Sequence, residues 1–224
     1  MEILDRQRKK VLSKIKIIGF DLDGTLYEST EEIQSRIREL IYKKISIGLG
    51  VNFKEAKNLF EESYAITSSG SKTIKKLEEQ FQRELEKELV QNAIQEAEIL
   101  DLIQFNPKLI TFLEKLREKY SIDLLTDSRR DLALKKLNRM GIDKDIFGYF
   151  LSAENGSKTD GTKFIEWVEK RGNHDPRTFL YVGDNKRQDV DSPKEFGITI
   201  CFIGKYNKAD FEIENIMGLE KLLL

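Results

Sequence analysis

Apolar and polar positions divide the chain into three stretches with different periods. Residues 14–20 form a β-branched apolar run that ends abruptly at Asp21, as a buried strand does before a polar turn. Residues 28–105 contain no proline, and their apolar residues recur every three or four positions, as in amphipathic helices. From Pro107 onwards, short apolar runs alternate with helical patterns. The pattern predicts a strand, a helical segment and then an α/β region.

The helical segment carries two long periodic runs, one over residues 33–45 and one over residues 77–93. Glycine, serine and other polar residues interrupt the pattern at 48–52 and at 66–73. We therefore expect an all-helical insert of about four helices, in which the second run is continuous helix.

The α/β region predicts a mostly parallel sheet, because its strands are separated by helices of about ten residues. The predicted strands are 121–126, 149–152, 179–183 and 198–203, and the predicted helices are 107–119, 129–140, 160–171, 192–196 and 218–224. The strand predicted at residues 14–20 completes the sheet. We predict a three-layer Rossmann-like core of residues 1–27 and 106–224, with the helical domain of residues 28–105 inserted after the first strand.

Composition and charge narrow the classes of protein. The 224 residues include 38 Lys and Arg and 39 Asp and Glu, so no net positive field favours a nucleic-acid binder. No apolar run reaches the roughly 20 residues that span a membrane, and the basic residues at 6–16 read as a solvated arm without a secretory signal. We expect a cytoplasmic protein. Its oligomeric state is left open.

A single cysteine, Cys201, excludes a disulfide within the chain and a cysteine-rich zinc site. A single histidine, His174, lies in a polar connection and argues against a Ser-His-Asp triad. Any acid-base chemistry at neutral pH then falls to carboxylates or lysines.

Polar side chains follow the predicted strands, and ligands of such sheets bind at the carboxyl ends of the strands. These side chains are Asp21, Asp23, Thr126, Asp127, Lys158, Asp184 and Asp189. Carboxylates gathered on one edge repel each other unless a cation is present. An all-oxygen ligand set favours Mg²⁺, and a lysine and a threonine hydroxyl beside that ion suit a phosphate group.

Four segments carry a resemblance to a known family. FDLDGTLY (20–27) resembles the first motif of the haloacid dehalogenase-like superfamily, and LLTDS (124–128) resembles its second. SKTDGTKF (157–164) and VGDNKRQDV (182–190) are similar to its third and fourth. Order and spacing agree over essentially the whole chain, and the insert is similar to the helical cap domain of the phosphatase branch.

The resemblance implies a role for each matching residue in a Mg²⁺-dependent phosphatase. Asp21 is the nucleophile that forms an aspartyl-phosphate. Asp23 is the general acid and then the general base, and its backbone carbonyl binds the metal. Thr126 and Lys158 hold the phosphoryl oxygens.

The fourth motif implies the rest of the metal site. Asp184 is a Mg²⁺ ligand together with Asp21 and Asp23, and Asp189 supports the metal site or pairs with the lysine. The ion would let an anionic aspartate approach an anionic phosphate.

Two positions depart from the family's motifs. The third motif commonly continues with proline, whereas Lys158 is followed by threonine here and Lys163 is a rival for its role. The shape of SKTDGTKF favours Lys158. Asp127 stands where the family often has a small or amide residue. The Asp127 carboxylate must point away from the phosphate or form an ion pair, and the arginines at 129–130 are candidate partners.

The expected substrate is a small phosphomonoester, bound under a cap that is hinged near Tyr27 and near residues 105–107. Phosphoglycolate, a sugar phosphate and a nucleoside monophosphate are all compatible. Lys72, in the connection at 68–72, either meets an anionic leaving group or is a solvated loop residue.

Two other functions stay open. A phosphomutase for sugar phosphates would share the first half of the reaction, and a non-catalytic module would bind a phosphorylated ligand without turnover. Dehalogenation is disfavoured, because it needs no acid or base at the position of Asp23.

Overall fold

A computed structural model describes residues 2–172 and 175–224, so His174 lies outside the described residues. The chain forms two compact units. One comprises the residues up to Ser29 together with Ile103–Leu224, and the other is Thr30–Leu102. No helix among the described residues is long and apolar enough to cross a membrane.

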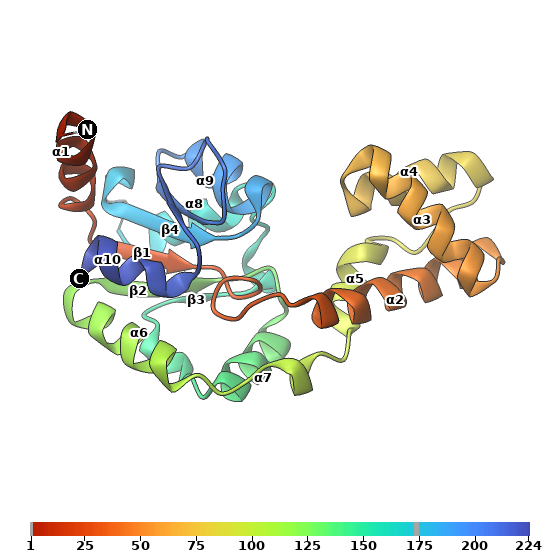
Figure 1. Ribbon diagram of the computed structural model, residues 1–224, viewed down its shortest axis with the longest axis horizontal. Helices are drawn as coiled ribbons and strands as arrows, with labels where there is room; N and C mark the ends of the chain where they lie inside the picture. Colours follow the sequence, from red (N-terminus) through yellow and green to blue (C-terminus); the bar gives the residue numbers. More distant parts are fainter. Residues whose placement is uncertain (1, 173–174) are drawn as a thin grey trace. The chain divides into compact units, whose positions relative to one another are not determined.

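The first unit is built on a six-stranded, all-parallel sheet with the strand order β3-β2-β1-β4-β5-β6 (Figure 1). The strands are β1 (Ile17–Phe20), β2 (Ser121–Leu125), β3 (Phe150–Leu151), β4 (Phe179–Gly183), β5 (Thr199–Ile203) and β6 (Phe211–Ile213). The prediction of an α/β fold with a parallel sheet is confirmed. The edge strand β6 was not predicted, because its three residues are flanked by polar ones and form too short a run to recognise. It pairs only with β5.

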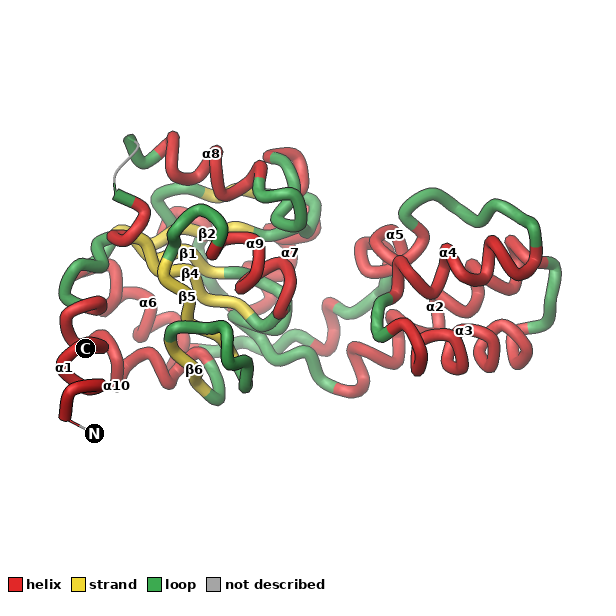
Figure 2. The backbone as a smooth tube through the Cα atoms, turned by 90° about the horizontal axis from the view of Figure 1, so that it is seen from above, coloured by secondary structure: helices red, strands yellow, loops and turns green. Residues whose placement is uncertain are grey.

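Helices cover both sides of this sheet, which gives the three-layer arrangement. α6 and α8 lie on opposite sides (Figures 1 and 2). The helices of this unit are α1 (Glu2–Leu12), α6 (Pro107–Lys119), α7 (Arg130–Met140), α8 (Thr162–Lys170), α9 (Ser192–Lys194) and α10 (Glu220–Leu223). The N-terminal stretch read as a solvated arm is thus partly helical, and its basic residues Arg8, Lys9 and Lys10 are exposed.

The core between α8 and the sheet is aromatic. Trp167 of α8 is fully buried and meets Phe179 edge-on, with ring centroids 4.9 Å apart. A Cβ at Gly19 of β1 would lie 2.6 Å from the Trp167 ring, so only glycine lets the helix pack this closely. Burial of such a ring stabilises the fold by about 2–3 kcal/mol. This packing fixes α8, which begins within the third motif, against the central strands.

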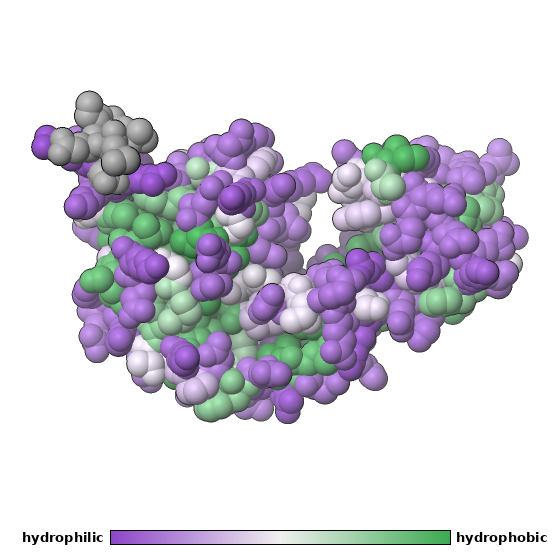
Figure 3. Space-filling view, in the orientation of Figure 1, coloured by the Kyte–Doolittle hydropathy of each residue, from purple (hydrophilic) through white to green (hydrophobic). Residues whose placement is uncertain are grey.

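The second unit consists of four α-helices with a core of their own. They are α2 (Glu31–Leu49), α3 (Phe53–Thr67), α4 (Gly70–Phe81) and α5 (Leu89–Glu96). Ile45, Ala56, Leu77 and Ala93 are fully buried in this core. Hydrophilic residues cover most of the face of this unit that Figure 3 shows. The periodic apolar positions therefore line its interior, as amphipathic helices require.

Two local predictions in this unit were wrong. The run over 77–93 is not one helix, since α4 ends at Phe81 and the chain resumes as α5 at Leu89. Gln82 and Glu88 border the connection with φ of 50° and 57°, a left-handed conformation that ends helical hydrogen bonding. The interruption at 66–73 is also shorter, because α4 starts at Gly70.

Candidate active site

The candidate site lies where neighbouring strands end. β1 is the central strand of the trio β2-β1-β4. The chain runs from β1 to β2 and β3 on one side of it and then returns to β4, β5 and β6 on the other. Asp21 directly follows β1, Thr126 follows β2 and Asp184 follows β4. This is the switch point of a parallel sheet, where the carboxyl ends of the strands leave room for a ligand.

Three carboxylates and one ammonium group meet there, and we call them the Asp21 cluster: Asp21, Lys158, Asp184 and Asp189. Lys158 Nζ lies 2.7 Å from Asp21 Oδ1 and 2.8 Å from Asp189 Oδ1. One oxygen from each of the three carboxylates lies within 4.8 Å of the others. When all groups are ionised, two negative charges remain uncompensated. The donor set therefore fits a hard divalent cation.

The pKa values of this cluster show the same charge imbalance. Burial, together with the charges of Asp189 and Asp184, raises the pKa of Asp21 well above its usual range, although Lys158 opposes the shift. Burial and the charge of Asp189 raise the pKa of Asp184 to about 7. Burial alone would lower the pKa of Lys158, but Asp189 and Asp21 raise it instead.

Two glycines let these carboxylates come so close to the backbone. Gly24 has a φ of 80°, and a Cβ there would lie 2.2 Å from Asp184 Oδ2. A Cβ at Gly183 would lie 2.4 Å from the Asp189 Cβ atom. A larger residue at either position would push a carboxylate out of the cluster.

Asp189 is fixed by four donors. The backbone N–H groups of Asp184 and Asn185 donate to its Oδ2 at 3.1 and 2.8 Å. Lys158 donates to its Oδ1 at 2.8 Å, and the Tyr181 hydroxyl shares its proton between this oxygen, at 3.3 Å, and the Leu125 carbonyl, at 3.1 Å. It stands on a π-helical turn, Lys186–Asp191, a rare irregularity that often marks functional sites. These contacts fix the Asp189 carboxylate, and that carboxylate holds the Lys158 ammonium group in place.

Lys163, the rival lysine, contacts different groups. Its Nζ lies 2.8 Å from Asp127 Oδ1 and also donates to the Thr126 carbonyl. Asp127 Oδ1 accepts from the Lys158 backbone N–H at 3.2 Å as well. Asp127 is thus paired with Lys163, rather than only with the arginines considered from the sequence, and this ion pair joins the second motif to the third.

Thr126 is fully buried, and its hydroxyl oxygen accepts the Ser128 backbone N–H at 3.0 Å. The hydroxyl proton stays available to donate. Lys72, in contrast, is exposed in the first turn of α4 in the helical unit, rather than in a loop.

Asp23 has surroundings of its own, which we call the Asp23 cluster: Asp23, Tyr27, Ser128 and Lys136. The Tyr27 hydroxyl and Lys136 Nζ both donate to Asp23 Oδ1. The Ser128 hydroxyl donates to Asp23 Oδ2 at 2.7 Å and lies 3.0 Å from Lys136 Nζ. Burial raises the pKa of Asp23, but the charge of Lys136 and the three hydrogen bonds outweigh it and lower the pKa below its usual range.

The sequence reading missed the three partners of Asp23. Lys136 carried a usable signal, because it stands on the apolar face of α7, among Leu132, Ala133, Leu137 and Met140. A lysine at a core position of an amphipathic helix needs a buried partner. Tyr27 and Ser128 lie inside the motifs but are not distinguished there from ordinary polar residues.

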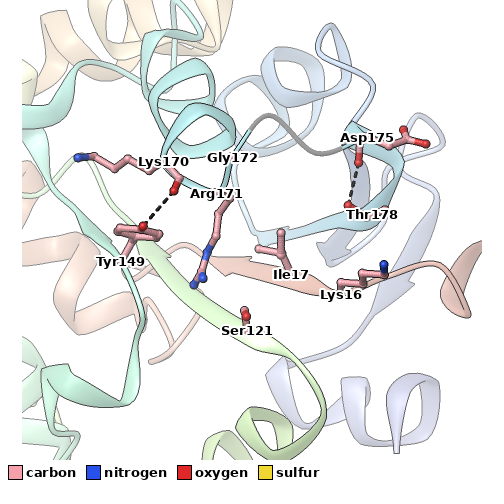
Figure 4. Close-up of a pocket in the computed structure, with 9 residues that line it drawn as sticks. All are labelled: Lys16, Ile17, Ser121, Tyr149, Lys170, Arg171, Gly172, Asp175 and Thr178. Atoms are coloured by element: carbon pink, nitrogen blue, oxygen red, sulfur yellow. Dashed lines mark hydrogen bonds between the residues drawn. The ribbon is translucent and has the colours of Figure 1, made fainter.

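A different cavity, of about 720 Å³, lies at the amino ends of the strands (Figure 4). Ile17 and Ser121, which line it, are the first residues of β1 and β2. Its Arg171 already donates to the buried carboxylate of Asp123, and the Tyr149 hydroxyl donates to the Lys170 carbonyl at 2.9 Å. Ligands of parallel α/β proteins bind at the carboxyl ends of the strands, so we do not assign this cavity as the active site.

A parallel sheet with acids and a lysine at its switch point defines a Rossmann-like α/β enzyme. A family model described as haloacid dehalogenase-like hydrolase matches residues 15–197. The chain belongs to this family of hydrolases, as the four motifs indicated.

Curated relatives match along nearly the whole chain. A glyceraldehyde 3-phosphate phosphatase of Methanocaldococcus jannaschii is 28% identical over 92% of this chain and 95% of its own length. A protein of the same name from Pyrococcus abyssi is also 28% identical, over 93% and 94%. Among solved structures, a haloacid dehalogenase-like phosphatase from Thermococcus onnurineus has a TM-score of 0.63 and 26% identity, and the match covers 93% of this chain and 98% of that one.

Proposed function

We propose that the protein is a Mg²⁺-dependent phosphatase that hydrolyses a small phosphomonoester through an aspartyl-phosphate. The observation that carries this proposal is the contrast between Asp21 and Asp23. One stands in a cluster that is short of positive charge and the other in a cluster rich in donors. A carboxylate beside a cation site and a lysine suits a nucleophile for phosphorus, and a second carboxylate two residues away can transfer the proton. The names of the archaeal relatives support phosphatase chemistry.

In the first step, a carboxylate oxygen of Asp21 attacks phosphorus and the bond from phosphorus to the ester oxygen breaks. The Asp23 carboxyl gives its proton to the leaving oxygen, which departs as an alcohol. Lys158 and the hydroxyl of Thr126 hold the phosphoryl oxygens, whose charge they would stabilise in the transition state.

In the second step, water attacks the phosphorus of the aspartyl-phosphate. Asp23, now a carboxylate, takes a proton from that water, and the bond from phosphorus to Asp21 breaks. Inorganic phosphate leaves, and both aspartates return to their starting states. Asp21, Asp184 and the backbone carbonyl of Asp23 would hold Mg²⁺, which screens the repulsion between Asp21 and the phosphate.

The proposal extends to the helical unit as a cap, since it is inserted between β1 and β2. A cap over the site excludes water and selects leaving groups, so small soluble esters are preferred to phosphoproteins. A cytoplasmic setting belongs to the same proposal. The names of the relatives add glyceraldehyde 3-phosphate to the candidate substrates.

The test is phosphate release from a panel of phosphomonoesters, with Mg²⁺ and with a chelator. The panel holds glyceraldehyde 3-phosphate, phosphoglycolate, sugar phosphates and nucleoside monophosphates. Asp21→Asn should abolish release, while Asp131→Asn makes the same change at an exposed carboxylate and should leave it intact. Release that persists undiminished in Asp21→Asn would refute the mechanism. Conversion between sugar phosphates without net release would favour a phosphomutase.

A further inference from the structure

Lys136 is a buried charge that the mechanism above does not use. Its side chain is completely inaccessible to solvent, although it stands in the middle of α7. Its Nζ lies between Asp23 Oδ1 and Ser128 Oγ. A lysine is rarely placed so deeply unless its charge is needed there, because burial of an ammonium group costs several kcal/mol.

The hydrogen bonds of this cluster have a fixed direction. An ammonium group only donates, so Ser128 Oγ accepts from Lys136. The single proton of the Ser128 hydroxyl is then free to point at Asp23 Oδ2, 2.7 Å away. Lys136 thus sets the orientation of a hydroxyl that would otherwise rotate.

The same contacts make the two oxygens of Asp23 unequal. A carboxylate oxygen has two lone pairs, and Oδ1 uses both of them to accept from Tyr27 and Lys136. Oδ2 accepts only from Ser128 among the described residues, which leaves one lone pair open. About a third of the Asp23 side chain is exposed, so the carboxyl group remains within reach of a ligand.

We propose that Lys136 is a positioning residue that acts directly and through Ser128 to hold the Asp23 carboxyl so that Oδ2 carries the transferred proton. The inference rests on the proposed function, in which Asp23 protonates the leaving oxygen. Lys136 contacts neither substrate nor phosphorus in this role. It keeps the proton-bearing oxygen turned to the open side of the cluster.

A positioning role has a signature that a purely structural role lacks. Proton donation is needed when the leaving group is an alkoxide, but hardly when it is a stable phenolate such as p-nitrophenolate. The ratio kcat/KM reports only the steps up to transfer of the phosphoryl group to Asp21, so later hydrolysis does not obscure it. Loss of positioning should therefore depend on the leaving group.

The experiment compares kcat/KM for p-nitrophenyl phosphate and for the best alkyl phosphate of the panel, in Mg²⁺, for the wild type and Lys136→Met. We expect kcat/KM for the alkyl ester to fall by about 10²-fold, the lower end of general acid catalysis, and for the aryl ester by less than about threefold. The matched control is Lys135→Met, the exposed neighbour on α7, which should change neither value. Equal losses on both esters, or no loss on either, would overturn the inference.

If Lys136→Met does not fold, a second variant tests the positioning role. Ser128→Ala removes a neutral hydroxyl and should cause a smaller loss, about tenfold, again on the alkyl ester alone. A uniform loss in Ser128→Ala would overturn the inference in that case. Failure of the proposed function looks different, because the wild type would then hydrolyse neither ester, or Asp21→Asn would remain active.

Discussion

The Asp21 cluster and the Asp23 cluster start from carboxylates two positions apart in the sequence and end in opposite environments. In the first, the buried carboxylates of Asp21 and Asp189 share Lys158 beside the half-buried Asp184, and the pKa of Asp21 is raised. One carboxylate has three donors in the second, and the pKa of Asp23 is lowered. Gly24, which follows Asp23 directly, leaves room for the Asp184 carboxylate beside this segment.

The difference shows how one short segment provides two chemistries. The Asp21 cluster has an excess of negative charge, so it needs a cation before it can accept a phosphate. The Asp23 cluster already balances the charge of its carboxylate with Lys136, so that side chain needs no cation.

Removal of Lys158 should have the largest effect. Lys158→Met leaves the buried carboxylates of Asp21 and Asp189 without their ammonium partner, which should cost about 3–5 kcal/mol of unfolding free energy. We also expect kcat/KM to fall by about 10²–10³-fold, because a donor to the phosphoryl group is lost. Urea unfolding and steady-state kinetics measure the two effects. Lys170→Met on α8, at a half-exposed ion pair with Glu166, should change stability by less than about 1 kcal/mol. Similar losses of stability and of kcat/KM in Lys158→Met and Lys170→Met would contradict the special role of the Asp21 cluster.

Mg²⁺ should stabilise the protein more at high pH than at low pH. The pKa of Asp184 is about 7 in the folded chain against an ordinary value of 3.8, so the folded state binds this proton more tightly than the unfolded state does. Without metal, this contribution to stability is present below pH 3.8 and is lost as the pH rises to about 7.

Mg²⁺ binds the ionised carboxylates and reverses that loss. At about 100 times its Kd near pH 8, it should add about 2.7 kcal/mol, and much less near pH 5. Thermal unfolding with Mg²⁺ and with EDTA at both pH values measures the difference. An equal gain in Tm at both would mean that the cluster is not the metal site.

Lys163→Met should have a smaller effect than Lys158→Met, because Lys163 pairs with Asp127 rather than with Asp21. We expect a loss of about 1–3 kcal/mol in stability and about tenfold in kcat/KM. The double variant with Asp127→Asn should recover part of the stability, since the carboxylate that loses its lysine is then gone as well. If Lys163→Met loses activity as severely as Lys158→Met, the roles of the two lysines are assigned wrongly.

Lys72→Ala should have the smallest effect. Lys72 is exposed on α4, so we expect an unchanged kcat and a KM that rises by no more than about threefold. Steady-state kinetics on the best substrate of the panel checks this. A 100-fold loss would place Lys72 among the residues that bind the leaving group.

The sequence predicted the sheet and most of its helices, because buried parallel strands such as 179–183 are continuous apolar runs between turn residues. The role of Gly19 could not be predicted from the sequence, because it arises only when Trp167 packs against this glycine in the fold. The break between α4 and α5 was hidden, since Leu85 stays buried in the connection and continues the apolar period.

The motif residues of the site were also visible in the sequence, but their partners were not. Asp21 and Lys158 are recognised by spacing. Lys136 meets Asp23 across 113 positions of the sequence, and only the fold brings them together. Periodicity around Lys136 could have marked it as buried, but not what it contacts.

The most direct test of the central contrast is a pre-steady-state experiment on Asp23→Asn with p-nitrophenyl phosphate and Mg²⁺. This leaving group needs no proton, so Asp21 should still be phosphorylated, while the missing base slows hydrolysis. The account predicts a burst of about one equivalent of p-nitrophenol per enzyme. Borohydride reduction after an acid quench should then convert Asp21 to homoserine, which mass spectrometry detects. Absence of a burst, or modification at an aspartate other than Asp21, would contradict the account.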